Sequence, residues 1–148
     1  MSRIERAMSY RTLISTGDVV VRAELVLELK TDQGTWEHVL FVVDSGTEMT
    51  TMWAADAQDQ NLRIPRRPIP GLTFQGQEVR SGLLRARIVG MDATEYLFPC
   101  YFVGDPNGVV SKSRNLLGMT GVINQIRITF DGTPTVLAPF GVLVVDKI

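Results

Sequence analysis

The chain has very few of the side chains that carry metal or thiol chemistry in proteins. It contains one cysteine, Cys100, and one histidine, His38. One cysteine forms no internal disulfide and no set of zinc thiolates, and one histidine would need several carboxylates beside it to hold zinc. The sequence also lacks a G-x-G-x-x-G or Walker-type phosphate loop. We therefore expect no metal ion and no cofactor.

A nucleophilic pair of Cys100 and His38 is a formal possibility. Cys100 lies in the apolar stretch Leu-Phe-Pro-Cys-Tyr-Phe-Val, which favours a buried, inert thiol. His38 lies in a strand-like segment, where a surface histidine is the commoner case. A serine hydrolase would also need His38 as its base, and no G-x-S-x-G elbow is present.

Excess charge of one sign and long apolar runs are absent too. Lys and Arg number 15 and Asp and Glu 16, a formal net charge of -1, so nothing in the composition favours nucleic acid or an anionic membrane as a partner. The longest apolar run is Val39 to Val43, whereas a membrane span needs roughly 20 residues. The amino-terminal stretch has no long apolar segment of the signal-peptide kind, so we expect a cytoplasmic protein.

The 148 residues fit one domain, and 45% hydrophobic with 21% charged residues is a globular composition. Residues 1–18 read as a polar amino-terminal lead, and residues 19–148 as a single domain. Apolar and polar residues alternate over 19–30, and a turn at 31–34 precedes a second strand over 35–43, which predicts a hairpin.

The rest of the chain alternates short β segments with turn signals, which predicts an all-β barrel or sandwich. A short helix is expected at 52–60, and 119–124 is a further helical candidate. Residues 63–71 contain three prolines and three arginines, so we expect an exposed loop there, with a basic peptide-binding patch as the alternative. Further strands are expected at 72–74, 78–89, 96–103, 125–130, 135–137 and 142–145.

The most informative position is Asp44, which directly follows the apolar run Val39 to Val43. A carboxylate at the end of a buried strand is costly unless it is hydrogen-bonded or shares a proton. An Asp-Ser-Gly turn at a strand end is also ordinary turn chemistry, so the tripeptide alone decides nothing. The surrounding segments have to decide between the two.

Those segments resemble the retropepsin-like aspartic proteases. That family has a hydrophobic strand running into Asp-Thr/Ser-Gly and a small residue, as Asp44-Ser45-Gly46-Thr47 does here. It has a glycine-containing flap hairpin, for which 68–89 is suitably placed. It also has two apolar residues and a glycine before a short helix and a strand, as at Leu116-Leu117-Gly118 and 126–131. Thr120 stands where relatives often have an acidic or amide residue.

The resemblance implies a closed β-barrel with one short helix and a role for each loop residue. Asp44 would be the catalytic aspartate, Ser45 would hydrogen-bond across a dimer axis, and Gly46 would allow the sharp loop. Thr47 would support the loop or the substrate backbone. Gly71, Gly76 and Gly82 are candidate flap-tip positions, and Gly71 and Gly76 are the expected substrate contacts.

Two aspartates close together share a proton and so supply an acid and a base at once. The chain has one Asp-Ser-Gly and is too short for a two-lobed enzyme, so the second aspartate has to come from a second copy across a twofold axis. We therefore expect a homodimeric endopeptidase that binds its peptide or protein substrate as an extended strand.

The alternative is a non-catalytic module of the same fold for dimerisation or extended-peptide binding. The carboxyl-terminal strand at 142–145 is consistent either with pairing across a dimer or with pairing inside the chain.

Overall fold

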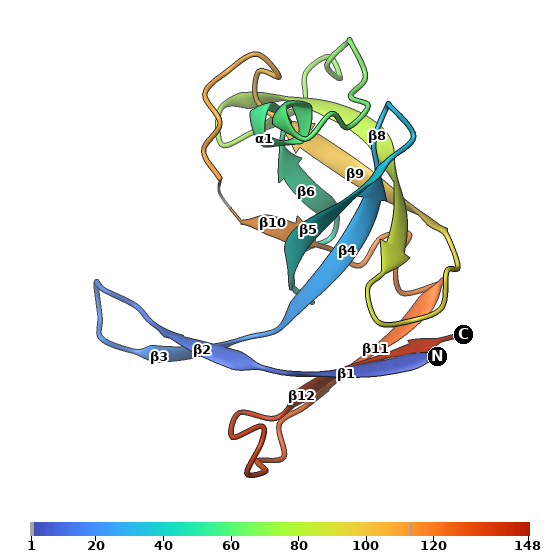
Figure 1. Ribbon diagram of the computed structural model, residues 1–148. Coiled ribbons are helices and arrows are strands. Elements are labelled where there is room, and N and C mark those ends of the chain that lie inside the picture. The colour runs from blue at the N-terminus through green and yellow to red at the C-terminus, as the bar shows by residue number, and fades with distance from the viewer. Residues whose placement is uncertain (1, 113) are drawn as a thin grey trace.

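The computed structural model describes residues 2–112 and 114–148 and contains a closed β-barrel (Figure 1). The barrel strands follow one another in space until the last pairs with the first. A further strand, β7 (Thr73–Phe74), forms a hairpin with β8 (Gln77–Ile88). In spatial order the barrel strands are β4 (Glu24–Lys30), β5 (Trp36–Val43), β10 (Asn115–Leu117), β6 (Thr50–Trp53), β9 (Tyr96–Val103) and β8 (Gln77–Ile88).

The alternation read from the sequence places the core. Leu25, Leu27 and Leu29 of β4 are at most 2% exposed, and they point into the barrel together with Phe41, Phe98 and Phe102. The expected hairpin of 19–30 with 35–43 is present over β4 and β5. The first of these strands is interrupted at Ala23, so that Val19–Arg22 forms a separate strand, β3.

The amino-terminal lead contains two strands that the sequence did not reveal. β1 (Arg3–Ala7) pairs with β12 (Val142–Lys147), whose other edge pairs with β11 (Ile126–Asp131). These two strands were not predicted because only Ile4 of β1 is buried and all of β2 is exposed, so the sequence has no alternating apolar pattern there. Both edges of β12 are therefore paired within the chain, so of the two pairings considered for the carboxyl-terminal strand it is the intramolecular one that the structure shows.

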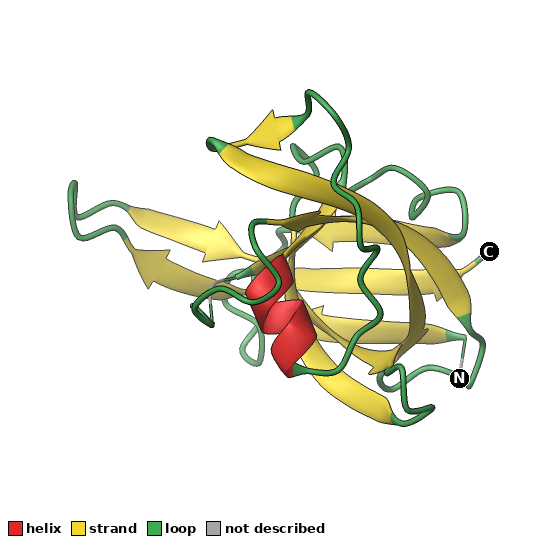
Figure 2. Ribbon diagram, turned by 90° about the horizontal axis from the view of Figure 1, so that it is seen from above, coloured by secondary structure: helices red, strands yellow, loops and turns green. Residues whose placement is uncertain are grey.

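β2 (Ser9–Thr12) pairs only with β3, and the two strands form a hairpin that projects from the body of the molecule (Figures 1 and 2). We call residues 9–22 the β2–β3 arm. Tyr10 lies 5.0 Å from the ring of Phe140 at the base of the arm. Apolar side chains along the arm are exposed: Tyr10, Leu13, Ile14, Val19 and Val21.

One helix, α1 (Ala54–Asp59), lies within the expected range 52–60, whose first residues belong to β6 instead. The helical candidate at 119–124 is wrong, because this segment forms successive turns. Gly121 has φ +71°, and a Cβ there would lie 2.4 Å from the ring of Pro99. A residue in the left-handed region cannot continue a right-handed helix, so Gly121 prevents a helix over 119–124.

The strand expected at 135–137 is also wrong. These residues lie in the loop between β11 and β12, and Val136 and Leu137 are more than 90% exposed. Pro134 and Pro139 lie on either side of them and offer no N–H to a neighbouring strand. Over the described residues, no helix has the length and apolar character that crossing a membrane requires.

Candidate active site

Asp44 begins the loop of residues 44–49 between β5 and β6, which we call the Asp44 loop, and β10 lies beside it. β10 runs parallel to β5, with Leu117 opposite Val43. The N–H of Asp44 donates to the carbonyl of Leu117 at 3.1 Å, and the N–H of Val43 donates to Ala23 at 2.9 Å. Two neighbouring strands therefore fix the backbone at the point where Asp44 leaves the sheet.

The carboxylate of Asp44 is half-buried and held by its own loop. The N–H of Gly46 donates to Oδ1 at 2.9 Å, and the hydroxyl of Thr47 donates to Oδ2 at 2.8 Å. A Cβ at position 46 would lie 3.3 Å from Oδ1, so glycine leaves room for this close approach. Each carboxylate oxygen thus has one donor, and the group is oriented before any ligand arrives.

Gly118 explains why a glycine follows Leu116 and Leu117. A Cβ on Gly118 would lie between 2.5 and 2.8 Å from backbone atoms of Met49 and Thr50. Only glycine therefore allows these two segments of the chain to cross here. The N–H of Gly118 donates to the Thr50 hydroxyl at 3.1 Å. The loop after Asp44 and the segment after β10 are therefore interlocked.

Two further backbone bonds complete this interlock. The N–H of Met119 donates to the backbone carbonyl of Thr47 at 3.1 Å, and the N–H of Thr120 donates to the backbone carbonyl of Glu48 at 2.8 Å. Thr120, which departs from the family pattern, is thus anchored through its backbone. The sequence analysis missed Thr50, which is fully buried and whose hydroxyl accepts from Gly118. No sequence signal marks it, because the neighbouring Thr51 has the same side chain.

Ser45 is exposed beside Asp44, and its side chain makes no hydrogen bond to the part of the chain that the structure describes. The hairpin of β7 and β8 turns at Gln75 and Gly76, whose φ angles are 51° and 77°. Two left-handed residues are typical of a tight two-residue hairpin turn, so Gly76 lies at the hairpin tip.

The other two candidate tip glycines lie elsewhere. Gly71, with φ +77°, lies in the loop before β7. Gly82 lies within β8, where a Cβ would meet Phe102 at 2.9 Å. No hydrogen bond joins the hairpin to the Asp44 loop within the described residues, so one chain alone does not bring Gly71 and Gly76 into bonded contact with Asp44.

His38 and Cys100 are not assembled into a pair. His38 is largely exposed on β5 and lies 3.4 Å from Glu28, whereas Cys100 is fully buried in the core. Burial raises the pKa of the Cys100 thiol well above its usual range, which makes it inert. Within residues 2–112 and 114–148, no group of three or more His, Cys, Asp and Glu is placed to hold a metal ion.

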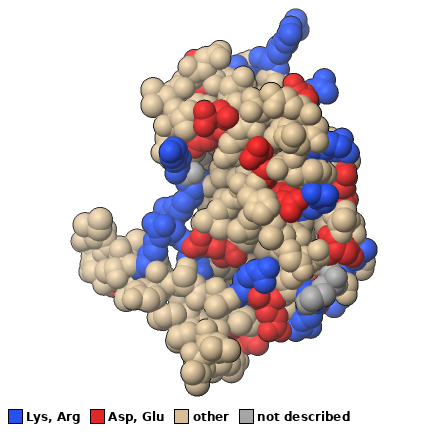
Figure 3. All heavy atoms as spheres, viewed as in Figure 1, with Lys and Arg blue, Asp and Glu red and all other residues tan. Residues whose placement is uncertain are grey.

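Charges of both signs are interspersed over the face seen in Figure 3. Arg22, the last residue of the arm, is 7% exposed. It precedes Ala23, whose carbonyl accepts a hydrogen bond from the N–H of Val43. Burial first, and then the like charges of Arg114 and Arg11, lower the pKa of Arg22. Arg22, Arg11 and Arg114 line one cavity with the acidic residues Glu24, Asp56 and Asp59, and Glu24 partly offsets this lowering of the pKa of Arg22.

No family model and no curated protein matches the chain. Among solved structures, it is similar to the crystal structure of a retropepsin-like aspartic protease from Rickettsia conorii, with a TM-score of 0.50 and 14% identity. The match covers 85% of this chain and 92% of that one. At this identity the likeness concerns the fold, and the chain has the closed all-β fold of the retropepsin-like proteases.

Proposed function

We propose that the chain is a cytoplasmic aspartic endopeptidase that acts as a homodimer. The observation that carries the proposal is the Asp44 loop. One carboxylate, held by Gly46 and Thr47, lies at the end of a core strand, and Gly118 crosses the backbone at the far end of the same loop, at Met49 and Thr50. This loop stands in a fold that a known aspartic protease shares.

The proposed reaction uses Asp44 of both copies. Two carboxylates close together retain one proton between them, because both cannot ionise at that distance. The ionised group takes a proton from a water molecule, which then attacks the peptide carbonyl carbon. The protonated group donates a hydrogen bond to the carbonyl oxygen, and the resulting intermediate breaks down with a proton passing to the leaving nitrogen.

The neighbouring residues have supporting roles in this proposal. Thr47 and Gly46 orient each carboxylate through the bonds described above. Ser45 is exposed, and its side chain has no hydrogen-bond partner among the described residues, so its hydroxyl is available to the loop of the second copy. Gly76 at the hairpin tip and Gly71 before it belong to the flap that would cover an extended peptide substrate.

The exposed apolar surface of the arm supports a second copy as partner. A two-stranded hairpin is only marginally stable alone, and this one has no third strand among the described residues. At its base is a cavity of about 580 Å³, which continues from the arm to Val43, next to Asp44. Its other lining residues include Met8, Val21, Phe130, Pro139 and Phe140. A second copy that covers this surface would contact Val43 and so lie next to Asp44.

The test is Asp44→Asn, with Asp59→Asn as the matched control because Asp59 is exposed on α1. Each protein is incubated with unfolded casein, and new peptide termini are read by mass spectrometry while sedimentation velocity reports the mass. We expect Asp44→Asn to abolish cleavage and keep the dimer, and Asp59→Asn to change neither. Retained cleavage in Asp44→Asn would refute the proposal, and a wild-type dimer that binds peptide without cleaving it would favour the non-catalytic module.

A further inference from the structure

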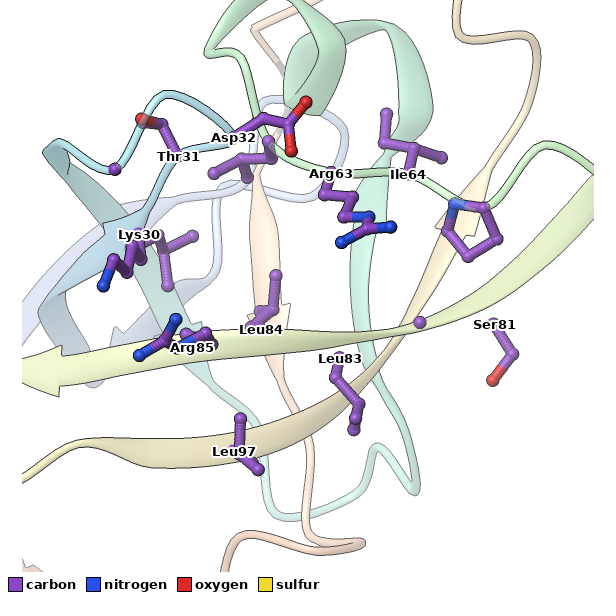
Figure 4. Close-up of a pocket in the computed structure, with 15 residues that line it drawn as sticks. Lys30, Thr31, Asp32, Arg63, Ile64, Ser81, Leu83, Leu84, Arg85 and Leu97 are labelled. Atoms are coloured by element: carbon purple, nitrogen blue, oxygen red, sulfur yellow. The ribbon is translucent and has the colours of Figure 1, made fainter.

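A second concave site lies on the barrel, lined by residues outside the Asp44 loop (Figure 4). It is a cavity of about 820 Å³ between β8, the turn after β4 and the loop after α1. Leu29, Leu62 and Leu84 give it an apolar floor. In Figure 4, Leu84 and Arg63 both point into the space between β8 and the loop.

The edge of β8 is open beside this cavity. β9 pairs with one side of β8 from Val79 to Ala86. On the other side, β4 pairs only with 86–88 and β7 only with 77–78, and Ile69 donates to the carbonyl of Val79. For 80–85, no strand of the described chain pairs with this second edge.

The loop after α1 shields only part of that edge. The would-be Cβ of Gly82 lies 3.2 Å from the ring of Pro65, and the Arg80 side chain donates to the carbonyl of Arg66 at 3.4 Å. Leu83 to Arg85 lie beyond this shield. Alternate residues of a strand present N–H and C=O groups to opposite sides, so this stretch offers backbone donors and acceptors toward the cavity.

The rim of the cavity is positive. Lys30, Arg63 and Arg85 line it with Asp32 as the one acidic residue among its lining. Arg85 is paired with Glu95 at 2.7 Å, which lies outside the lining, whereas Arg63 has no ion pair with any described residue. An acidic group of a ligand would therefore meet an uncompensated guanidinium directly above the apolar floor.

We propose that this cavity, the β8 slot, binds an extended peptide segment that carries an apolar side chain next to an acidic one. The peptide backbone pairs with the free edge of Leu83 to Arg85, the apolar side chain covers Leu84, and the acidic side chain binds Arg63. The open backbone edge favours a peptide over a small amphiphile, because only a peptide matches alternating donors and acceptors. The slot is independent of Asp44 chemistry.

The test uses full-length Asp44→Asn protein, so that cleavage does not consume the ligand. The probes are the acetylated, amidated pentapeptide Val-Glu-Val-Glu-Val, its Val-Lys-Val-Lys-Val counterpart and decanoate. Binding is measured by calorimetry, and the site is located from the backbone amide NMR shifts of Leu83 to Arg85. Arg63→Glu tests the rim, and Arg67→Glu, an exposed arginine of the same loop outside the lining, is the matched control.

The acidic peptide is expected to bind, to shift the amides of Leu83 to Arg85, and to lose about tenfold or more in affinity in Arg63→Glu but not in Arg67→Glu. The lysine peptide is expected to bind far more weakly. Equal binding of the two peptides, equal loss in the two variants, or shifts elsewhere would overturn the proposal. If decanoate binds and the peptides do not, the slot is a site for small amphiphiles. If the amide shifts depend on protein concentration alone, the slot is a contact between copies of the chain. Either result refutes the peptide assignment.

Discussion

At the scale of single residues, the hydroxyl of Thr47 is the side-chain donor that fixes Asp44. We predict that Thr47→Val, which keeps the shape but removes the hydroxyl, lowers kcat/KM by about tenfold to a hundredfold, as expected for one hydrogen bond to a charged group. Thr47→Ser is expected to retain most of the activity. Steady-state cleavage of a fluorogenic peptide checks both; equal activity of the valine variant and wild type would contradict the orienting role.

Cys100 provides a second residue-scale prediction. Because its thiol is fully buried and burial raises its pKa, the native protein is expected to react with Ellman's reagent at least about a hundredfold more slowly than the protein unfolded in urea. The release of the coloured thiolate measures both rates. Rapid reaction of the native protein would show that the barrel opens around β9.

The sequence predicted Asp44 as the candidate site residue because a carboxylate after a buried strand needs an explanation, and the structure gives one in the donors from Gly46 and Thr47. The role of Thr50 was not predictable. Its importance arises from a chain crossing between segments far apart in the sequence, which no local pattern records.

At the scale of elements, the crossing of Gly118 over the Asp44 loop is the tightest contact of the site. We predict that Gly118→Ala destabilises the protein by roughly 2–3 kcal/mol, because its Cβ meets backbone rather than a movable side chain. Gly132→Ala is the control, since a Cβ there meets nothing within 4 Å, and is expected to change stability by less than about 0.5 kcal/mol. Urea unfolding compares the two; similar stabilities would contradict the interlock.

The loop before β9 is tied to β12 through Asp92. The hydroxyl and N–H of Thr94 and the ammonium of Lys147 lower the pKa of Asp92 to about 2. Since the unfolded value is about 3.9, this contribution is present above pH 4 and is lost as the pH falls toward 2.

Asp92→Asn is therefore expected to lose less stability than wild type between about pH 4 and pH 2. Urea unfolding at several pH values measures the difference, and the carboxyl carbon shift of Asp92 reports its midpoint directly. A midpoint near 4, or parallel pH profiles, would contradict the tie.

Elements with a clear alternation were predictable, as β4 and β5 illustrate, because one face of each is buried in the core. β1 was not, since it pairs at the edge of a small sheet with only Ile4 buried. The expected helix at 119–124 failed because Gly121 adopts a left-handed conformation against Pro99, a contact made only in the folded chain.

At the scale of the whole molecule, the projecting arm is the feature that the barrel alone does not account for. We predict that Ile14→Lys, at the fully exposed end of the arm, raises the dimer dissociation constant by about tenfold or more. Val109→Lys, an exposed apolar residue in the loop after β9, is the control and is expected to leave the dimer unchanged. Sedimentation velocity over a dilution series measures both; unchanged association of Ile14→Lys would exclude the arm from the interface.

The central claim, that one site takes Asp44 from each of two chains, is tested most directly by titrating Asp44→Asn protein into wild-type protein and measuring peptide cleavage per wild-type chain. Random pairing predicts about half of the original rate in an equal mixture and about a tenth with a roughly tenfold excess of the variant, because mixed dimers have one aspartate. A rate per wild-type chain that stays constant across the titration would contradict the account.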